Sequence, residues 1–127
     1  MSSVVLDASA LLAVLLQEPG ADKVERVLQS SLISTVNVSE VVASAVERGL
    51  MLETVMPCLT RLSIVMVPFD VEQATIAASF RPATRSLGLS LGDRACLALG
   101  FLRKLPVMTA DQLWAKADIR ITVEMIR

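Results

Sequence analysis

The chain has 127 residues and a formal net charge of −1, with 54% hydrophobic and 20% charged residues. This length fits one domain with one core, and the composition excludes a disordered or linker segment. No apolar run approaches the roughly 18–20 residues that cross a bilayer. The longest candidate, residues 4–16, contains Asp7 and Ser9 and has no basic leader. We therefore expect a soluble, cytoplasmic protein with no membrane association.

Histidine is absent from the sequence, and the two cysteines, Cys58 and Cys96, lie far apart. The absence of histidine excludes Ser-His-Asp and Cys-His catalysis, histidine zinc sites and nucleases with a histidine general acid or base. Two distant cysteines do not make a disulfide framework. We expect both to be reduced, and Cys96, which lies among alanines and leucines, to be buried. Enzymatic chemistry must therefore come from carboxylates, lysines, hydroxyls or thiols.

Short apolar segments alternate with segments of helical periodicity along the chain. We expect strands at residues 4–6, 32–34, 64–67, 106–108 and 121–125. We expect helices at residues 8–17, 24–28, 37–49, from 50 onward with a cut or kink at Pro57, 70–80, 90–102 and 110–116. Strands that alternate with helices form a mostly parallel sheet with helices on both faces. The predicted fold class is therefore α/β, a three-layer α/β/α sandwich.

Four acidic residues are placed where this sheet would bring them together. Asp7 ends the first predicted strand, and Asp111 follows the 106–108 strand by three residues. Glu40 and Asp93 are expected in the first turns of their helices. Ligands of open α/β sheets bind in the crevice beyond the carboxyl ends of the strands. We expect all four carboxylates to reach that crevice.

Three of these acids also have a simpler structural explanation. Glu40 follows Asn37, and Asp93 follows Ser90, at the spacing of a capping box, in which the acid bonds back to the start of its own helix. Asp111 could stabilise a helix N-terminus through the helix dipole. The sequence leaves both explanations open for each of the three.

Asp7 has no such local explanation. A carboxylate at the end of a buried strand loses its hydration, at a cost of several kcal/mol unless a partner compensates, and the nearest downstream basic residue is Lys23. Several carboxylates in one crevice also repel one another, and a divalent cation would relieve both costs. Oxygen ligands without histidine or cysteine favour Mg²⁺ or Mn²⁺. Such an ion activates a water for phosphodiester hydrolysis, which is the chemistry that the acids predict.

The four acids lie in the segments VVLDASA (4–10), NVSE (37–40), LSLGDRACLA (89–98) and VMTADQLW (107–114). Together these segments resemble PIN-domain proteins, most closely the VapC-type toxins of bacterial type II toxin–antitoxin systems. The resemblance covers essentially the whole chain in the family's order and spacing, although residues 50–64 match nothing specific in the family. It implies a PIN-like fold and a single nuclease domain over residues 1–127.

The resemblance further implies a toxin that is an Mg²⁺-dependent endoribonuclease, with Mn²⁺ as an alternative ion. The family's metal-binding and catalytic acids correspond to Asp7, Glu40, Asp93 and Asp111. Asp7 and Asp93 rank first among them as direct metal ligands. Hydroxyl positions that support the site in the family correspond to Ser9 and Thr109.

The resemblance also implies two protein partners, a second copy of the chain in a homodimer and a cognate VapB-like antitoxin that inhibits the toxin. A segment of such an antitoxin packs into an apolar groove and directs a basic side chain at the acidic pocket. The helices before Ser30 and between Asn37 and Ile64 could line this groove. The alternative is that the same apolar residues simply form the core.

The implied substrate is RNA, although the net charge is slightly negative. A basic group surrounds the predicted 90–102 helix: Arg81, Arg85, Arg94, Arg103 and Lys104. Each fits a solvated helix face when taken singly, and Arg94, beside Asp93, is the candidate for a phosphate contact or a structural ion pair. Aromatic residues make up 3% of the chain, too few for base stacking as the main mode of recognition. We expect recognition of shape and phosphates, as in a structured RNA such as tRNA.

One alternative function stays open, a non-catalytic PIN-like module that binds metal or RNA as a scaffold. The intact set of four acids favours the enzyme, because a scaffold would not need all of them. A haloacid-dehalogenase-like phosphatase would need a second acid two residues after Asp7, where Ser9 stands.

Overall fold

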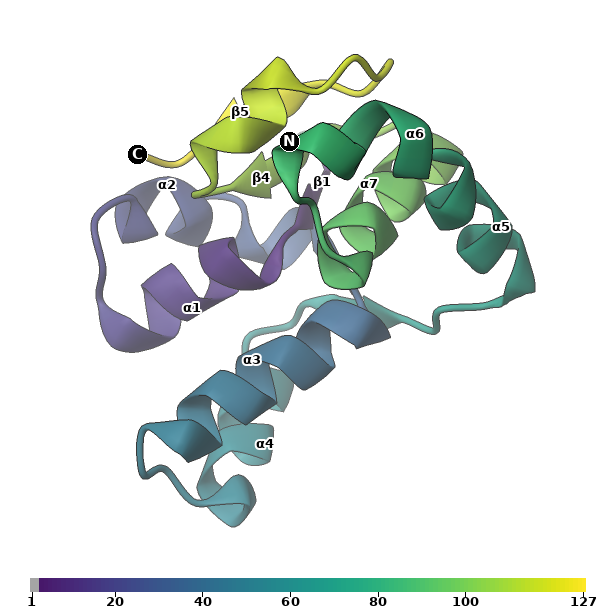
Figure 1. Cartoon of the computed structure of the whole chain (residues 1–127). Helices are drawn as coiled ribbons and strands as arrows, with labels where there is room; N and C mark the ends of the chain where they lie inside the picture. The colour runs from purple at the N-terminus through teal and green to yellow at the C-terminus, as the bar shows by residue number, and fades with distance from the viewer. Residues whose placement is uncertain (1–2) are drawn as a thin grey trace.

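Five short strands form one sheet in the computed structural model, which describes residues 3–127 (Figure 1). The strands are β1 (Val4–Leu6), β2 (Ser31–Ser34), β3 (Val65–Val67), β4 (Val107–Thr109) and β5 (Val123–Met125). Their order across the sheet is β3-β2-β1-β4-β5, and each neighbouring pair is parallel. The predicted mostly parallel α/β sheet is confirmed, and the described sheet is parallel throughout.

Helices connect the strands and cover both faces of the sheet. The α-helices are α1 (Ala8–Leu16), α2 (Ala21–Glu25), α3 (Thr35–Glu47), α4 (Leu52–Arg61), α5 (Val71–Ser79), α6 (Arg81–Thr84) and α7 (Leu91–Arg103). Short 3₁₀ turns lie at Leu28–Ser30, Arg85–Leu87 and Gln112–Lys116 (η1, η2 and η3). None of the described helices combines the length and the apolar composition that a membrane span requires.

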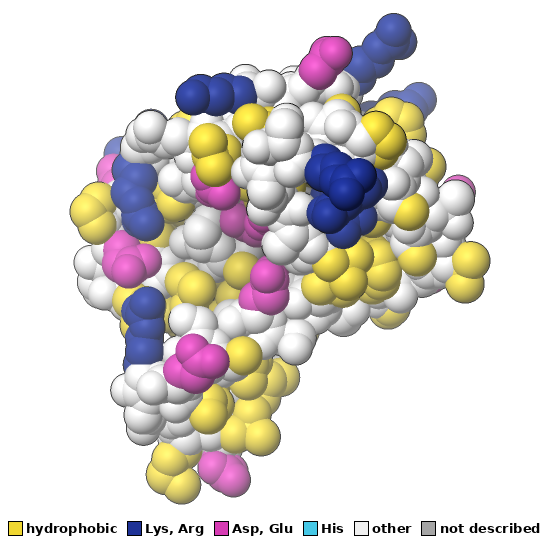
Figure 2. All heavy atoms as spheres, in the orientation of Figure 1, with side chains coloured by type: hydrophobic (Ala, Val, Ile, Leu, Met, Phe, Trp, Pro, Cys, Tyr) yellow, Lys and Arg dark blue, Asp and Glu magenta, His cyan; other side chains and the backbone are white. Residues whose placement is uncertain are grey.

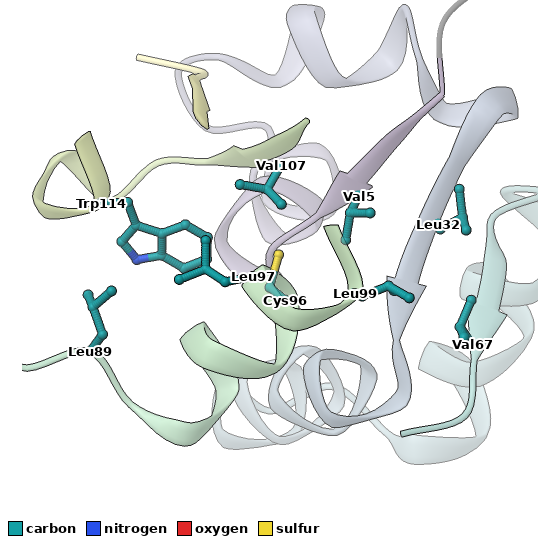
Figure 3. Packing of buried hydrophobic residues seen from close by; sticks show 9 residues of the cluster. All are labelled: Val5, Leu32, Val67, Leu89, Cys96, Leu97, Leu99, Val107 and Trp114. Carbon is teal, nitrogen blue, oxygen red and sulfur yellow. The ribbon is translucent and has the colours of Figure 1, made fainter. Parts of the chain in front are cut away.

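Alternation along the strands divides the core into two layers. One residue of each of four strands enters the layer beneath α7 and η3: Val5, Leu32, Val67 and Val107. Figure 3 shows these side chains directed toward Cys96 and the leucines of α7, with the indole of Trp114 beside Leu97. The alternate strand residues pack on α1 to α4 instead: Val4, Leu6, Ile33, Met66 and Met108. The predicted three-layer sandwich and the burial of Cys96 are therefore confirmed.

Three predicted helices differ from the observed ones, and the one expected over residues 110–116 is the 3₁₀ turn η3, because Asp111 caps it and it begins at Gln112. The helix expected from Asn37 begins at Thr35, because Ser34 at the end of β2 caps it by accepting a hydrogen bond from the Val36 amide (3.2 Å). The helix expected to reach Leu28 ends at Glu25 and gives way to η1, which delivers the chain to β2. Glu40 therefore lies in the second turn of α3 rather than the first.

The α3–α4 pair extends away from the sheet, at the bottom of the view in Figure 1. The pair packs on α1 and β2 through one apolar cluster that includes Leu11, Ile33 and Leu59, and α4 continues through Pro57 without a break. Large apolar side chains are exposed at and near the turn between the two helices: Val46, Leu50, Met51 and Leu52. This exposed group is the α3–α4 tip.

Candidate active site

The first predicted site acid, Asp7, lies where the chain connections leave the sheet in opposite directions. From β1 the chain proceeds to β2 and β3 on one side, whereas β4 and β5 lie on the other. Ligand sites of open parallel sheets form beyond the carboxyl ends of the strands at such a switch point. Asp7 follows β1, and its amide donates to the Met108 carbonyl of β4 (2.9 Å). Asp7 and Thr109, the last residue of β4, thus lie beside each other.

The Asp7 carboxylate is buried and held by two hydroxyl groups. Its Oδ2 accepts hydrogen bonds from Ser9 Oγ (2.7 Å) and Thr109 Oγ1 (3.0 Å), and it caps α1 through the Ser9 amide (3.4 Å). Ser9 Oγ in turn accepts from the Ala110 amide (2.9 Å), and Thr109 Oγ1 accepts from the Asp111 amide (3.1 Å). Because the ionised carboxylate can only accept, both hydroxyls donate their protons to Asp7 and use their oxygens to accept from the backbone; the two hydroxyl oxygens lie 3.2 Å apart. The two hydroxyls predicted to support the site are next to its central carboxylate.

The pKa of Asp7 is raised from 3.8 to about 6, and burial is the largest cause of this net shift. The negative charges of Asp93 and Glu40 raise it further, while the hydrogen bonds from Ser9 and Thr109 oppose the shift. Asp7 is only 4% exposed, so near neutral pH the protein holds a carboxylate that would be more stable if neutralised. Protonation or a bound cation would supply that neutralisation.

A pH dependence of folding follows from Asp7 alone. Its folded pKa lies above its unfolded pKa, so the folded state binds more protons, and the free energy of unfolding decreases as pH rises from about 4 to about 6. The full shift corresponds to about 3 kcal/mol. Urea unfolding of the metal-free protein at several pH values checks this, and a stability that rises across this interval would contradict it.

Glu40 is half-buried and held by Asn37 rather than by the start of its own helix. The side-chain amide of Asn37 donates to Glu40 Oε1 (2.8 Å), so the capping-box explanation for Glu40 is wrong. Desolvation raises the pKa of Glu40, the Asn37 hydrogen bond opposes this, and the charge of Asp93 adds to the increase. Glu40 on α3 is therefore close enough to Asp93 on α7 for the two negative charges to repel.

Asp93 and Asp111 act as helix caps, as the simpler explanation predicted. Asp93 closes a capping box at the start of α7: its Oδ2 accepts from the Ser90 amide (2.8 Å), and its own amide donates to Ser90 Oγ (3.2 Å). Asp111 caps η3 by accepting from the Leu113 amide (3.0 Å). Desolvation is the main cause that raises the pKa of Asp93, and the charge of Asp111 contributes to it. Asp93 and Asp111 can therefore cap their helices and still belong to the group of four acids.

The four predicted acids form one electrostatically coupled group. Asp93 and Glu40 act on Asp7, Asp93 acts on Glu40, and Asp111 acts on Asp93. Figure 2 shows one face of the molecule, with acidic side chains near its middle and basic side chains around them. Even so, across residues 3–127 no three acidic, histidine or cysteine side chains lie close enough to ligate one ion directly. Each acid instead bonds to its local hydroxyl, amide or backbone group.

The donor set of this group fits a hard divalent cation. Carboxylate and hydroxyl oxygens are what Mg²⁺ and Mn²⁺ prefer, and Mg²⁺ keeps several of its waters rather than filling its shell with protein ligands. Two nearby carboxylates and water would satisfy it without a ready-made cage. The buried Asp7 carboxylate, which gains most from a positive charge, would be the first ligand.

Arg94 bonds to the backbone of α5 rather than to an acid of the site. Its Nη1 donates to the Ala77 carbonyl of α5 (3.1 Å), which fixes α5 against α7. Within the described chain, no ion pair joins Arg94 to Asp93, although its charge lowers the pKa of Asp93 slightly against the larger effects. The predicted structural ion pair of Arg94 is therefore wrong, and its contact with a substrate phosphate stays a prediction.

Comparison with known proteins identifies the family. The PIN domain model matches residues 4–120 of the chain. The chain belongs to the PIN domain family. No curated protein sequence matches it, so the PIN domain assignment depends on the family match and on solved structures.

Three solved structures show how widely this PIN domain fold is shared. A chain of the DNA-bound VapBC complex from Salmonella typhimurium is similar over 100% of both chains, with a TM-score of 0.78 and 17% identity. A chain of a toxin–antitoxin complex from Klebsiella pneumoniae matches with a TM-score of 0.77 and 18% identity over 98% of each chain. A chain of VapBC-5 from Mycobacterium tuberculosis matches with a TM-score of 0.63 and 22% identity, over 100% of this chain and 99% of that chain. The predicted PIN-like fold is confirmed.

The Thr109 hydroxyl allows a direct test of the support given to Asp7. In Thr109→Val, the carboxylate loses one donor and the Asp111 amide loses its acceptor, so divalent-ion affinity should fall by about 10–100-fold. Thr84→Val is the matched control, because Thr84 is equally buried but donates to the Phe80 carbonyl, outside the site. Calorimetric titration with Mn²⁺ compares the two variants. Equal affinities would show that Thr109 has no role at the site.

Sequence reasoning missed two residues of this site, Gly92 and Asn37, the second of which was expected only as a helix cap. A glycine in the first turn of a helix is unfavourable by propensity, and that was the available signal. Gly92 lies between the capping residue Ser90 and Asp93 and faces Glu40 of α3.

Proposed function

We propose that this PIN domain is a metal-dependent endoribonuclease of the VapC toxin type, which acts in the cytoplasm on RNA. The observation that carries the proposal is the buried Asp7 carboxylate, clamped by Ser9 and Thr109 and coupled to three further acids. Asp7 also caps α1, but the groups that lower its pKa are the hydroxyls of Ser9 and Thr109, and neither carries a positive charge to balance the buried carboxylate. The arrangement is suited to a cation.

The chemistry would be divided between the ion and the chain. A bound Mg²⁺, or Mn²⁺, would activate the attacking water and neutralise charge on the phosphodiester. Asp7 and Asp93 would hold the ion, and Glu40 and Asp111 would complete the acidic surround and orient its waters. Ser9 and Thr109 would keep the Asp7 carboxylate in one rotamer, so that no reorganisation is needed when the ion arrives.

The substrate we propose is a structured RNA such as tRNA. Exposed arginines on α6 and η2, Arg81 and Arg85, precede the α7 start that carries Asp93. Guanidinium groups bind phosphates through paired donors, so we propose that these two residues contact the RNA backbone. Arg94 would contribute only if it left the Ala77 carbonyl.

A protein inhibitor and a second copy of the chain complete the proposal. The similar chains from Klebsiella pneumoniae and Salmonella typhimurium belong to toxin–antitoxin and VapBC complexes. Exposed apolar side chains at the α3–α4 tip are of the kind that protein partners cover. We propose a VapB-like antitoxin as inhibitor and a homodimer as the state of the free toxin.

The experiment is cleavage of total RNA and of purified tRNA by the chain freed of any bound antitoxin. We expect discrete RNA fragments with Mg²⁺ or Mn²⁺, and mapping of the new RNA ends would define the target. The alternative is a scaffold that binds metal or RNA without cutting. Binding of RNA with no new ends, under any tested ion, would favour that scaffold.

A further inference from the structure

Asn37 connects the two helices that carry Glu40 and Asp93. Its side chain is fully buried between α3 and α7, and the amide nitrogen donates two hydrogen bonds. One goes to Glu40 Oε1 (2.8 Å), on the next turn of α3, and the other to the Gly92 carbonyl of α7 (3.0 Å). Both protons of one amide group are therefore used to join the Glu40 carboxylate to the first turn of α7.

Gly92 leaves the space that Glu40 occupies. The nearest atoms to a Cβ built on Gly92 are the three atoms of the Glu40 carboxyl group, and all three would collide with it. The backbone of Gly92 is not in the left-handed region, so its conformation would accept alanine. Alanine is also the better residue in a helix. Close approach of Glu40, rather than backbone freedom, therefore accounts for glycine here.

We propose that Asn37 and Gly92 form a seat that holds the Glu40 carboxylate beside Asp93, with Asn37 as a positioning residue of the acidic site. This inference rests on the proposed metal-dependent function, and it goes beyond the four acids and two hydroxyls. Glu40 has a long side chain, and the like charge of Asp93 favours rotamers that carry it away. The seat opposes that movement, so a divalent cation meets the two carboxylates already close together.

The seat is tested by two substitutions that disturb it from opposite sides. Gly92→Ala should displace the Glu40 carboxylate while the fold remains, because the colliding group is the free end of a flexible side chain. Asn37→Leu removes both hydrogen bonds at similar size. We expect each variant to bind Mn²⁺ about tenfold more weakly or worse in calorimetric titration. Asn37→Thr, which keeps one donor, should fall between Asn37→Leu and the unsubstituted chain.

The matched control is Gln73→Leu. Gln73 is also a buried amide, and it donates to the Pro68 carbonyl away from the acids. Gln73→Leu and Asn37→Leu should both lower the free energy of unfolding, but only Asn37→Leu should weaken Mn²⁺ binding. If Gly92→Ala and Asn37→Leu bound Mn²⁺ as tightly as the unsubstituted chain, the seat would be refuted and the metal-dependent function would stand.

A second readout needs no metal. In the metal-free protein, NMR should show the Asn37 side-chain amide protons protected from exchange, because both are hydrogen-bonded in a buried position. Gly92→Ala should remove the protection of the proton donated to Glu40 but not of the proton donated to the backbone carbonyl of residue 92, and Gln73→Leu should leave both protected. Unchanged protection of both protons in Gly92→Ala overturns the seat. If the unsubstituted chain bound no Mn²⁺ and cut no RNA, the proposed function would fail, and this readout would still decide on the seat.

Discussion

Asp7→Asn is expected to abolish RNA cleavage and, at the same time, to stabilise the metal-free fold. The substitution keeps the shape of the side chain but removes the charge that would bind the cation, so the rate should fall by at least about 10²–10³-fold. The same change removes a buried charge whose pKa is raised to about 6. At neutral pH the free energy of unfolding should therefore increase, by up to about 3 kcal/mol.

The two opposite effects distinguish loss of chemistry from loss of structure. Asp22→Asn is the matched control, because Asp22 is exposed on α2, forms an ion pair with Arg26 (3.6 Å) and is not one of the four site acids. It should cleave RNA normally and unfold at nearly the same urea concentration. Cleavage by Asp7→Asn at the normal rate would refute the carboxylate mechanism. A lower free energy of unfolding in Asp7→Asn would contradict the raised pKa of Asp7.

Removal of divalent ions should stop cleavage completely, and their addition should stabilise the fold. An ion that binds only the folded state adds about 2.7 kcal/mol at a concentration one hundred times its dissociation constant. Binding requires ionised Asp7, whose pKa is about 6, so apparent affinity should fall about tenfold between pH 7 and pH 5. The raised pKa values of Glu40 and Asp93 act in the same direction.

Thermal unfolding with and without Mn²⁺ at the two pH values measures this linkage. EDTA should abolish both the cleavage and the added stability, and excess Mg²⁺ should restore them. The Asp7→Asn variant supplies the control, because its melting temperature should no longer respond to the ion. Cleavage that continued in EDTA would identify a metal-independent enzyme and would refute the proposed mechanism.

Local patterns were sufficient to predict the sheet and the position of Asp7. The run Val4-Val5-Leu6 is apolar and β-branched, so it forms a buried strand, and the acid that ends it must lie at the carboxyl edge. The helix start at residue 37 was wrong for a local reason too. Ser34 and Asn37 are both good N-caps. Ser34 caps the helix because β2 ends at this residue.

The contacts that organise the site depend on residues far apart in the chain. Thr109 lies 102 positions from Asp7, and Gly92 lies 55 positions from Asn37. Nothing in the neighbouring sequence of either residue records which helix or strand it will meet. Such contacts arise from the register between β1 and β4 and from the packing of α3 on α7, and a single sequence predicts the layers but not these registers.

Trp114 gives the molecule an optical reporter of its own. It is the one tryptophan in a chain without tyrosine, and its indole is buried in the layer beneath β1 and β4 (Figure 3). Nearly all intrinsic emission should therefore come from one apolar position, at short wavelength in the folded state. Trp114 lies in η3, which Asp111 caps. Unlabelled protein should thus report events at the acidic group through a single fluorophore.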